Sequence, residues 1–321
     1  MYTPPITLTQ KIITCCISIS RLLGYSDGIN SPEPKPKLRR ENQIKTIQST
    51  LAIEGNEFSL DQITAVIEGK RVVGKEKELL EVQNTISVYK RIGDWRPTRI
   101  NSMLKAHKLL MNQLIDNPGS WRTGNVGIIK GKKISHVAPS ASRVPSLMND
   151  LFEYLKKEKE TDLLIKACIF HYEFLFIHPF IDGNGRMARL WQQLILISQN
   201  SIFRHVSIES LIKENQKEYY QMLEISDKMG ESTVFVEFML RLILLELDKL
   251  VSTLRQKKTT SSDRIKQAHA AFKTNQFSRK DYLELFTEIS TATASRDLKK
   301  AVEETYLLKE GSKATTVYRF Q

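Results

Sequence analysis

A short segment in the second half of the chain concentrates side chains that can handle phosphate, a metal ion and a proton. Residues 178–189 read His-Pro-Phe-Ile-Asp-Gly-Asn-Gly-Arg-Met-Ala-Arg. His178 is a base that can take a proton from an attacking hydroxyl near neutral pH. Asp182 offers an oxygen ligand, and Mg²⁺ commonly binds through one or two carboxylates together with substrate phosphates. The segment therefore predicts chemistry at a phosphate group.

The second half of this segment has the composition of an anion-binding helix start. Gly183, Asn184 and Gly185 let the backbone approach a ligand closely, where free N–H groups of a new helix point outward. Arg186 and Arg189 are three residues apart, so both project from the first turn and can bind phosphate oxygens. Taken alone, these features are ordinary in capped loops, turns and solvated helix faces. Their occurrence in one short segment favours a phosphate site.

This segment resembles the Fic family signature H-x-F-x-D/E-G-N-G-R-x-x-R and matches it at every specified position. The resemblance implies a protein adenylyltransferase, which transfers AMP from Mg-ATP to a Ser, Thr or Tyr hydroxyl of a target protein and also of itself. It implies that His178 is the general base, that Phe180 anchors the loop in the core and that Asp182 binds Mg²⁺ or Mn²⁺. The implied phosphate contacts of the co-substrate ATP are Asp182, Gly183, Asn184, Gly185, Arg186 and Arg189.

The resemblance covers most of residues 1–250 and extends to a candidate β-hairpin. Residues 126–129 and 134–137 read as two short strands around a basic turn. In the family, a flap at this place, here 122–139, aligns a segment of the target protein by strand addition. The resemblance also implies nucleotide contacts from Ile134, Ser135, His136, Tyr219, Tyr220 and Asp227. Paired tyrosines on a helix are equally compatible with core packing.

Residues 49–56 resemble the family's inhibitory motif, S/T-x-x-x-E-G/N, with Thr50, Glu54 and Gly55 at the matching positions. Thr50 and Glu54 are four residues apart and share one helix face. A carboxylate in the last turn of a helix is disfavoured by the helix dipole, so a cation must compensate. The resemblance implies that Glu54 pairs with Arg189 in place of the γ-phosphate. It places the chain among Fic proteins with an N-terminal inhibitory helix.

The composition is that of a folded, basic, globular protein. The chain has 321 residues, 41% of them hydrophobic and 26% charged, and its net charge of +12 favours an anionic partner. Three cysteines exclude a disulfide framework and a zinc ligand set, and they fit a reducing cytoplasm. The sequence contains no run of about 18 uncharged apolar residues, so it predicts no membrane span. Lys11 interrupts 6–23, the only segment with the character of a targeting signal.

The chain is predicted to be mainly α, with a Fic-type helical bundle, a β-hairpin flap and a C-terminal winged helix-turn-helix domain. Residues 1–37 hold a helix, with apolar positions Leu8, Ile12, Cys16, Ile19 and Leu23, and a connector at 31–37 whose alternating prolines exclude a helix. The Fic domain spans 38–256, with the inhibitory helix at about 38–55. Its expected helices are roughly 38–54, 59–68, 75–94, 98–115, 142–158, 161–177, 184–199, 207–227 and 231–256.

Residues 257–321 form the predicted winged helix-turn-helix domain, after a polar run at 256–263. Helices are expected near 263–273, 278–286 and 291–304, followed by strands at 306–308 and 315–320. The third helix resembles recognition helices of bacterial winged-helix regulators. Its candidate DNA contacts are Thr293, Ser295, Arg296, Lys299 and Lys300. A protein partner for 263–320 is the alternative, because the basic character is diluted by Asp281, Glu284, Glu288 and Asp297.

Two other functions stay open on these residues. One is a different Fic reaction, such as removal of AMP or transfer of another phosphate-containing group. The other is a winged-helix DNA-binding regulator in which the Fic domain only senses nucleotide. Family members commonly dimerise, so self-association is expected as well.

Overall fold

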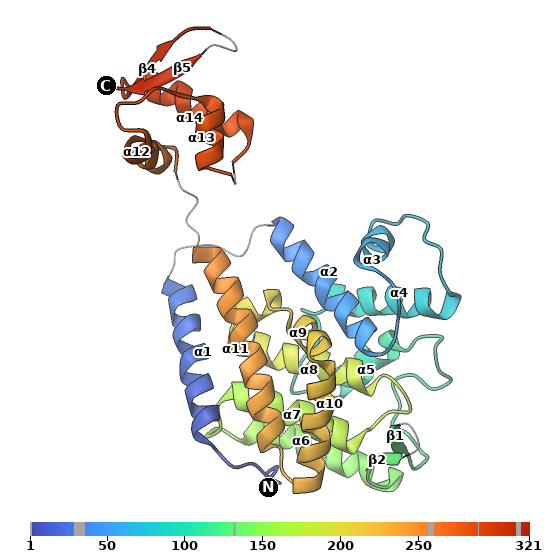
Figure 1. Ribbon diagram of the computed structural model, residues 1–321. Helices are drawn as coiled ribbons and strands as arrows, with labels where there is room; N and C mark the ends of the chain where they lie inside the picture. Colours follow the sequence, from blue (N-terminus) through green and yellow to red (C-terminus); the bar gives the residue numbers. More distant parts are fainter. Residues whose placement is uncertain (1, 29–35, 131–132, 256–259, 288, 313–315) are drawn as a thin grey trace. The chain divides into compact units, whose positions relative to one another are not determined.

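The computed structural model describes residues 2–28, 36–130, 133–255, 260–287, 289–312 and 316–321. The side chains of 27–28, 128–136 and 255 are not part of this description. The chain is mainly helical and forms two compact units, Met1–Ser252 and Thr253–Gln321 (Figure 1). Within the described residues, no helix has both the length and the apolar character that crossing a membrane requires.

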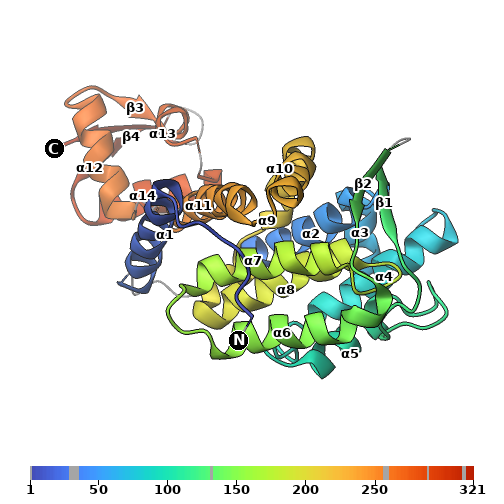
Figure 2. The same ribbon diagram turned by 90° about the horizontal axis from the view of Figure 1, so that it is seen from below.

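Two buried helices form the centre of the first unit. Helices α7 (Leu163–Ile177) and α8 (Asn184–Gln199) pack against each other (Figure 2). Helix α7 is apolar around most of its circumference, and a helix of this kind lies inside a protein. Its N-cap, Asp162, accepts a hydrogen bond from the Leu164 N–H at 2.8 Å. The predicted catalytic segment therefore begins in the loop that joins two buried helices.

The remaining helices of the first unit surround this pair. The Ser59 side chain and Gln62 form a capping box at the start of α3, and Pro145 lies in the first turn of α6. The short 3-10 helices are η1 (Ala141–Arg143) and η2 (Ser201–His205). The α-helices are α1 (Gln10–Gly28), α2 (Pro36–Ile53), α3 (Leu60–Ile67), α4 (Glu76–Lys90), α5 (Ile100–Leu110), α6 (Val144–Lys157), α9 (Ile208–Glu214), α10 (Gln216–Met229) and α11 (Thr233–Arg255).

The first helix starts later than the sequence predicts. Leu8 precedes α1 and its side chain is exposed, so it is not a core position. Ile12, Ile19 and Leu23 are buried as expected, and Cys16 is partly buried. The apolar spacing located the buried face correctly, but its first position, Leu8, lies two residues before the helix.

Two other boundaries correct the predictions. Helix α2 begins at Pro36, inside the stretch expected to be extended, because the fixed φ of proline suits a first helical turn. Residues 31–35 of that stretch lie outside the described part. The helix expected over 207–227 is interrupted at Asn215, whose side-chain amide donates to the Leu211 carbonyl at 2.9 Å. The Asn215 N–H donates to the same carbonyl at 3.0 Å, and α9 ends and α10 begins at this residue.

A β-hairpin lies beside the loop between α7 and α8. Strands β1 (Gly127–Lys130) and β2 (Lys133–Val137) pair antiparallel, with Gly127 opposite Val137 and a register irregularity between Ile128 and Ile129. Strand β2 also contacts α10. A two-stranded hairpin is marginal alone, so its contacts with the helices must hold it in place.

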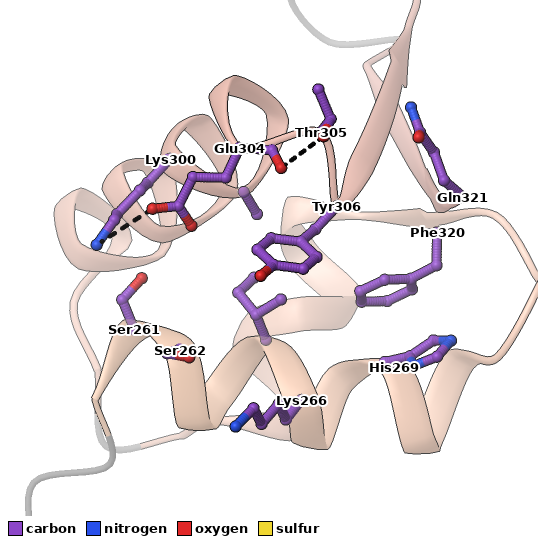
Figure 3. A pocket seen from close by; sticks show the side chains of 12 residues that line it. Ser261, Ser262, Lys266, His269, Lys300, Glu304, Thr305, Tyr306, Phe320 and Gln321 are labelled. Atoms are coloured by element: carbon purple, nitrogen blue, oxygen red, sulfur yellow. Dashed lines mark hydrogen bonds and ion pairs between the residues drawn. The ribbon is translucent and has the colours of Figure 1, made fainter.

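The second unit combines three helices with a small antiparallel sheet. Its helices are α12 (Ser261–Phe272), α13 (Arg279–Leu285) and α14 (Thr291–Glu303). Strands β3 (Phe277–Ser278), β4 (Leu307–Glu310) and β5 (Val317–Phe320) form a sheet in the order β3-β5-β4. Sequence reasoning missed β3, because two residues carry no periodicity. A cavity of about 230 Å³ lies between α12, the end of α14 and β5, and its lining includes Lys266, His269, Lys300 and Tyr306 (Figure 3).

A buried ion pair joins α12 to α14 in this unit. The Arg264 Nε donates to Asp297 Oδ2 at 2.6 Å, and its Nη2 donates to Oδ1 at 3.0 Å. The Tyr282 hydroxyl donates to the same carboxylate at 3.4 Å. Asp297 is 4% exposed, since it lies on the same side of α14 as the buried Ala294 and other core residues. Asp297 therefore compensates Arg264 inside the unit and does not lie on the exposed face of α14.

We expect Asp297→Ala to destabilise the second unit by about 3–5 kcal/mol, because it removes the carboxylate from a buried ion pair. The measurement is hydrogen exchange of α12 and α14 amides in the full chain at increasing urea. The matched control is Glu284→Ala, which removes an exposed partner of Lys280 and should change stability by less than about 1 kcal/mol. Equal effects of the two variants would contradict this assignment.

Candidate functional site

His178 stands at the end of α7 in a backbone conformation that is rare for a residue with a side chain. Its φ of 50° and ψ of 60° are left-handed, which costs about 1–2 kcal/mol for a non-glycine residue. Hydrogen bonds hold it there: its N–H donates to the Phe174 carbonyl at 3.0 Å, and its carbonyl accepts from Arg122 Nε at 2.8 Å. The half-buried imidazole is thus attached to a fixed backbone.

Asn184 closes the loop from inside. Its Oδ1 accepts from the Phe180 N–H at 2.9 Å, and its Nδ2 donates to the Phe180 carbonyl at 2.9 Å. The oxygen and the nitrogen of the amide side chain therefore both form hydrogen bonds within the loop. We therefore expect the predicted phosphate contact of Asn184 to come from its backbone N–H. Phe180 is fully buried, as expected of a core anchor.

His107, on α5, contacts the loop between α7 and α8. The sequence did not predict this role. Its ring stacks on Phe180 with centroids 3.6 Å apart. The Gly119 N–H donates to its Nδ1 at 2.9 Å, so Nε2 carries the proton and donates to the Asp182 carbonyl at 3.0 Å. Burial lowers the pKa of His107 to about 4, which keeps the ring neutral at pH 7. A neutral histidine thus fixes the backbone at Asp182.

Asp182 and Gly183 form the turn into α8. The Asp182 Oδ1 accepts from the Gly183 N–H at 2.5 Å and lies 3.6 Å from Arg186 Nη2, while its side chain is half exposed. Gly183 has a φ of +81°, and a Cβ there would lie 2.8 Å from Met111 Sδ, so glycine is required. Within the described residues, no group of three or more His, Cys, Asp or Glu side chains could hold a metal. A Mg²⁺ ion would need substrate phosphates besides Asp182.

Arg186 is a buried cation whose donors are incompletely used. Its side chain is 5% exposed, and its carboxylate contacts, 3.6 Å to Asp182 and 4.0 Å to Glu81 Oε1, are longer than hydrogen bonds. In the described part of the chain, its Nε and Nη1 have no hydrogen-bond partner. Buried donors without partners are costly, and the oxygens of a bound phosphate would satisfy them. Glu81, on α4, was not foreseen from the sequence.

Arg189 is bound by the C-terminal part of α2. Its Nη2 lies 2.7 Å from Glu54 Oε1, and its Nε donates to Thr50 Oγ1 at 2.9 Å. Its Nη2 also donates to the Thr50 carbonyl at 3.1 Å, and the guanidinium is almost fully buried. Burial acts to lower the pKa of Arg189, but the Glu54 carboxylate and nearby tyrosines raise it above its usual range. Helix α2 stops after Ile53, and Gly55 has a φ of +92°.

The Glu54 carboxylate lies directly over the start of α8. A Cβ added to Gly185 would overlap Glu54 Oε1 and lie 3.2 Å from Arg189 Nη1. The first turn of a helix presents free N–H groups and the positive end of its dipole, both of which attract anions. The carboxylate of this chain thus lies where the sequence predicts a phosphate.

The predicted adenine and ribose contacts lie in different environments. Tyr219 is 1% exposed, and its hydroxyl lies 2.9 Å from His171 Nε2, so its ring is part of the core. Tyr220 is 39% exposed. The half-buried Asp227 accepts a hydrogen bond from the Tyr172 hydroxyl at 3.0 Å. The side chains of Ile134, Ser135 and His136 lie outside the described part of the structure, so their contacts stay predictions.

The fold and the loop define a helical protein with an anion site at the start of a buried helix, next to a histidine. A family model described as Fic/DOC matches residues 97–196. The crystal structure of a Fic family protein from Desulfovibrio desulfuricans G20 is 37% identical and superposes with a TM-score of 0.75, covering 100% of this chain and 98% of that chain. The chain belongs to the Fic/DOC family.

Two protein adenylyltransferases are less similar to this chain. Protein adenylyltransferase fic-1 of Caenorhabditis briggsae is 30% identical over 213 residues, which is 63% of this chain and 40% of that protein. A probable protein adenylyltransferase of Aquifex aeolicus is 30% identical over 158 residues, 43% of this chain and 48% of that protein. This chain thus spans less than half the length of both. Fic-1 of Caenorhabditis elegans, 23% identical with a TM-score of 0.61, covers 77% of this chain and 72% of that chain and shares the fold.

We expect His107 to make folding of the first unit sensitive to acid. Its folded pKa of about 4 lies below the ordinary histidine pKa of 6.5, so the unfolded chain takes up this proton first as the pH falls. The stability it contributes is complete above pH 6.5, and about 3 kcal/mol is lost by pH 4. The measurement is urea unfolding of wild type and His107→Gln at pH 7 and 4. The stability difference between them should shrink by about that amount, whereas an unchanged difference would refute the assignment.

Proposed function

We propose that this protein is an adenylyltransferase that transfers AMP from Mg-ATP to a Ser, Thr or Tyr hydroxyl of a target protein. The observation that carries the proposal is the anion site at the start of α8, adjacent to His178. There two buried nitrogens of Arg186, Nε and Nη1, have no hydrogen-bond partner in the described structure. The carboxylate of Glu54 already lies over Gly185. The names of the curated relatives support the same activity.

In this mechanism His178 acts as the general base. It accepts the proton of the target hydroxyl, whose oxygen attacks the α-phosphorus of ATP as pyrophosphate leaves. The start of α8, Arg186 and Arg189 hold the phosphates in line with the attacking oxygen. Positioning and charge neutralisation supply most of the acceleration in such transfers. A Mg²⁺ or Mn²⁺ ion held by Asp182 and the phosphates would neutralise part of the triphosphate charge.

The hairpin presents the target in this proposal. A two-stranded hairpin has unpaired backbone groups along its outer edges, and an extended segment of another protein can pair with such an edge. The pairing would carry the hydroxyl of the target toward His178. A second copy of the chain would serve as the target in the same way, so we expect self-modification and self-association.

Glu54 holds the enzyme in a resting state. Its carboxylate pairs with Arg189 and lies over Gly185, so the γ-phosphate of ATP cannot bind there at the same time. ATP then binds in a pose in which the α-phosphorus is not open to attack. The Arg189 guanidinium is almost fully buried, whereas the Glu54 side chain is 33% exposed. Removing only the carboxylate frees the guanidinium for phosphate. The proposed site of action is the cytoplasm.

The activity is tested by intact mass after incubation with Mg-ATP. We expect Glu54→Gly to add AMP to protein at least about tenfold faster than wild type, because the loss of one such contact exceeds about 1.4 kcal/mol. Glu57→Gly, three residues further on at an exposed position, is the matched control and should behave as wild type. Adding His178→Ala to Glu54→Gly should lower the rate about 10²–10⁴-fold with ATP affinity retained.

The outcomes separate the alternatives. Absence of AMP on any protein, with AMP released from a modified target, would replace transfer by AMP removal. Another phosphate-containing adduct would assign a different Fic transfer. A Glu54→Gly rate no higher than that of wild type would refute the inhibition.

We propose that the second unit is a winged helix-turn-helix that contacts DNA through α14. The supporting observation is that Asp297 turns inward to Arg264, which leaves Arg296, Lys299 and Lys300 exposed on the outer side of α14. Lys300 lies 3.6 Å from Glu304, a pair visible in Figure 3, so part of this charge is compensated. Strands β4 and β5 would form the wing. A regulator whose Fic domain only senses nucleotide is the alternative that this surface favours.

We expect the full chain to bind a random-sequence 20-base-pair duplex with an affinity that falls steeply with salt. Arg296→Ala should weaken binding and reduce the slope of log K against log salt by about 1. Lys157→Ala, on an exposed position of α6, is the control and should leave both unchanged. The measurement is fluorescence anisotropy at several salt concentrations. Binding without salt dependence, or no binding, would contradict the DNA assignment and favour a protein partner.

A further inference from the structure

Arg122 is buried and makes an unusual set of contacts. It is 5% exposed, and each hydrogen-bond partner of its side chain in the described structure is a backbone carbonyl. The donors are Nε to His178 at 2.8 Å, Nη1 to Gly124 at 2.8 Å, and Nη2 to Pro139 and, at 3.3 Å, to Ile177. Its own N–H donates to the Pro179 carbonyl at 2.9 Å.

These carbonyls belong to two parts of the site. Ile177 and His178 end α7, whose last carbonyls have no partners within the helix and lie at the negative end of its dipole. Gly124 precedes β1 and Pro139 follows β2, so they are the two ends of the hairpin. One side chain therefore ties the end of α7 to both ends of the hairpin.

Other buried arginines in the chain are used differently. Arg189 pairs with Glu54, and Arg264 pairs with Asp297. For Arg122, burial lowers the pKa of the guanidinium, and no carboxylate among the described residues forms an ion pair with it. Its charge is balanced by carbonyl dipoles instead. A planar guanidinium with five donors can bridge several carbonyls, whereas the single ammonium of lysine cannot span them.

The neighbouring residue strengthens the attachment to the loop. The Trp121 ring lies against Phe180, with centroids 5.0 Å apart. Residues 121–122 thus contact the catalytic loop through an aromatic ring, a guanidinium and a backbone N–H. Each side-chain nitrogen of Arg122 donates to a backbone carbonyl of the described structure, so its role is internal.

We propose that Arg122 is a positioning residue that holds the backbone of His178 and the two ends of the hairpin in one arrangement, so that the base meets the hydroxyl presented by the hairpin. This inference rests on the proposed function, since it assigns the hairpin to the target and His178 to proton transfer. Arg122 acts through other residues and does not touch the reacting atoms. Its loss should slow transfer without weakening ATP binding, because Arg186 and the start of α8 are separate from these contacts.

The test compares Arg122→Gln and Arg122→Lys in the Glu54→Gly background. Arg143→Gln, an exposed arginine shortly after the hairpin, is the matched control. Two quantities are measured: the rate of AMP addition to the chain itself at saturating Mg-ATP, by intact mass, and the ATP dissociation constant, by calorimetry. Both Arg122 variants should label about 100-fold more slowly, with the dissociation constant within about twofold of the parent, and the control should match the parent. Labelling within about twofold of the parent would overturn the proposal, as would a rate loss fully explained by weaker ATP binding.

Hydrogen exchange gives a readout that does not depend on activity. Arg122→Lys keeps the positive charge but loses the planar guanidinium that bridges the carbonyls. It therefore tests the proposal even if Arg122→Gln does not fold. In this variant, exchange should increase together at 124–127, 137–139 and 177–180, with α1 and α11 unchanged. An increase confined to the hairpin or to the loop, or spread over the whole unit, would overturn the coupling. A parent that adds no AMP would refute the proposed function, and the exchange result would still decide whether Arg122 couples the two segments.

Discussion

The loop at 178–183 joins the carbonyl end of one buried helix to the amide end of another, and each end requires charge of the opposite sign. The guanidinium of Arg122 meets the carbonyl end of α7. The carboxylate of Glu54 lies over the amide end of α8. Both charges come from elements outside the two helices. The fold of the first unit thus places Arg122 at the end of α7 and Glu54 at the start of α8.

This constraint also separates what is permanent from what can be exchanged. In the described structure, the side chain of Arg122 binds backbone carbonyls, and no ligand of the site can replace it there. Glu54 instead holds the place of an anion at a helix start, where a phosphate offers the same kind of oxygen with more charge. The contacts of Arg122 thus suit a structural role, whereas the contact of Glu54 can be exchanged for a phosphate and suits regulation.

Neutral groups complete the loop between these charges. Asn184 binds both backbone groups of Phe180, and a neutral His107 binds the Asp182 carbonyl. These bonds do not involve a ligand, so the loop is in place before one binds. Preorganisation of this kind avoids reordering the site at the moment of reaction. Arg186 is the exception, since two of its buried nitrogens have no hydrogen-bond partner in the described structure.

The sequence by itself determined the segment 178–189 and most helices, because these depend on local spacing and on a signature of adjacent residues. The pairing of Glu54 with Arg189 was expected only from the family resemblance, since the two residues lie 135 positions apart. It did not reveal His107, Glu81 or Arg122, nor that Asp297 faces inward. His107 lies 75 residues from Asp182, and Arg122 lies 56 residues from His178. Contacts over such separations leave no periodic pattern in the chain. Only the packing of helices decides which histidine is buried under the loop and which arginine reaches the end of α7.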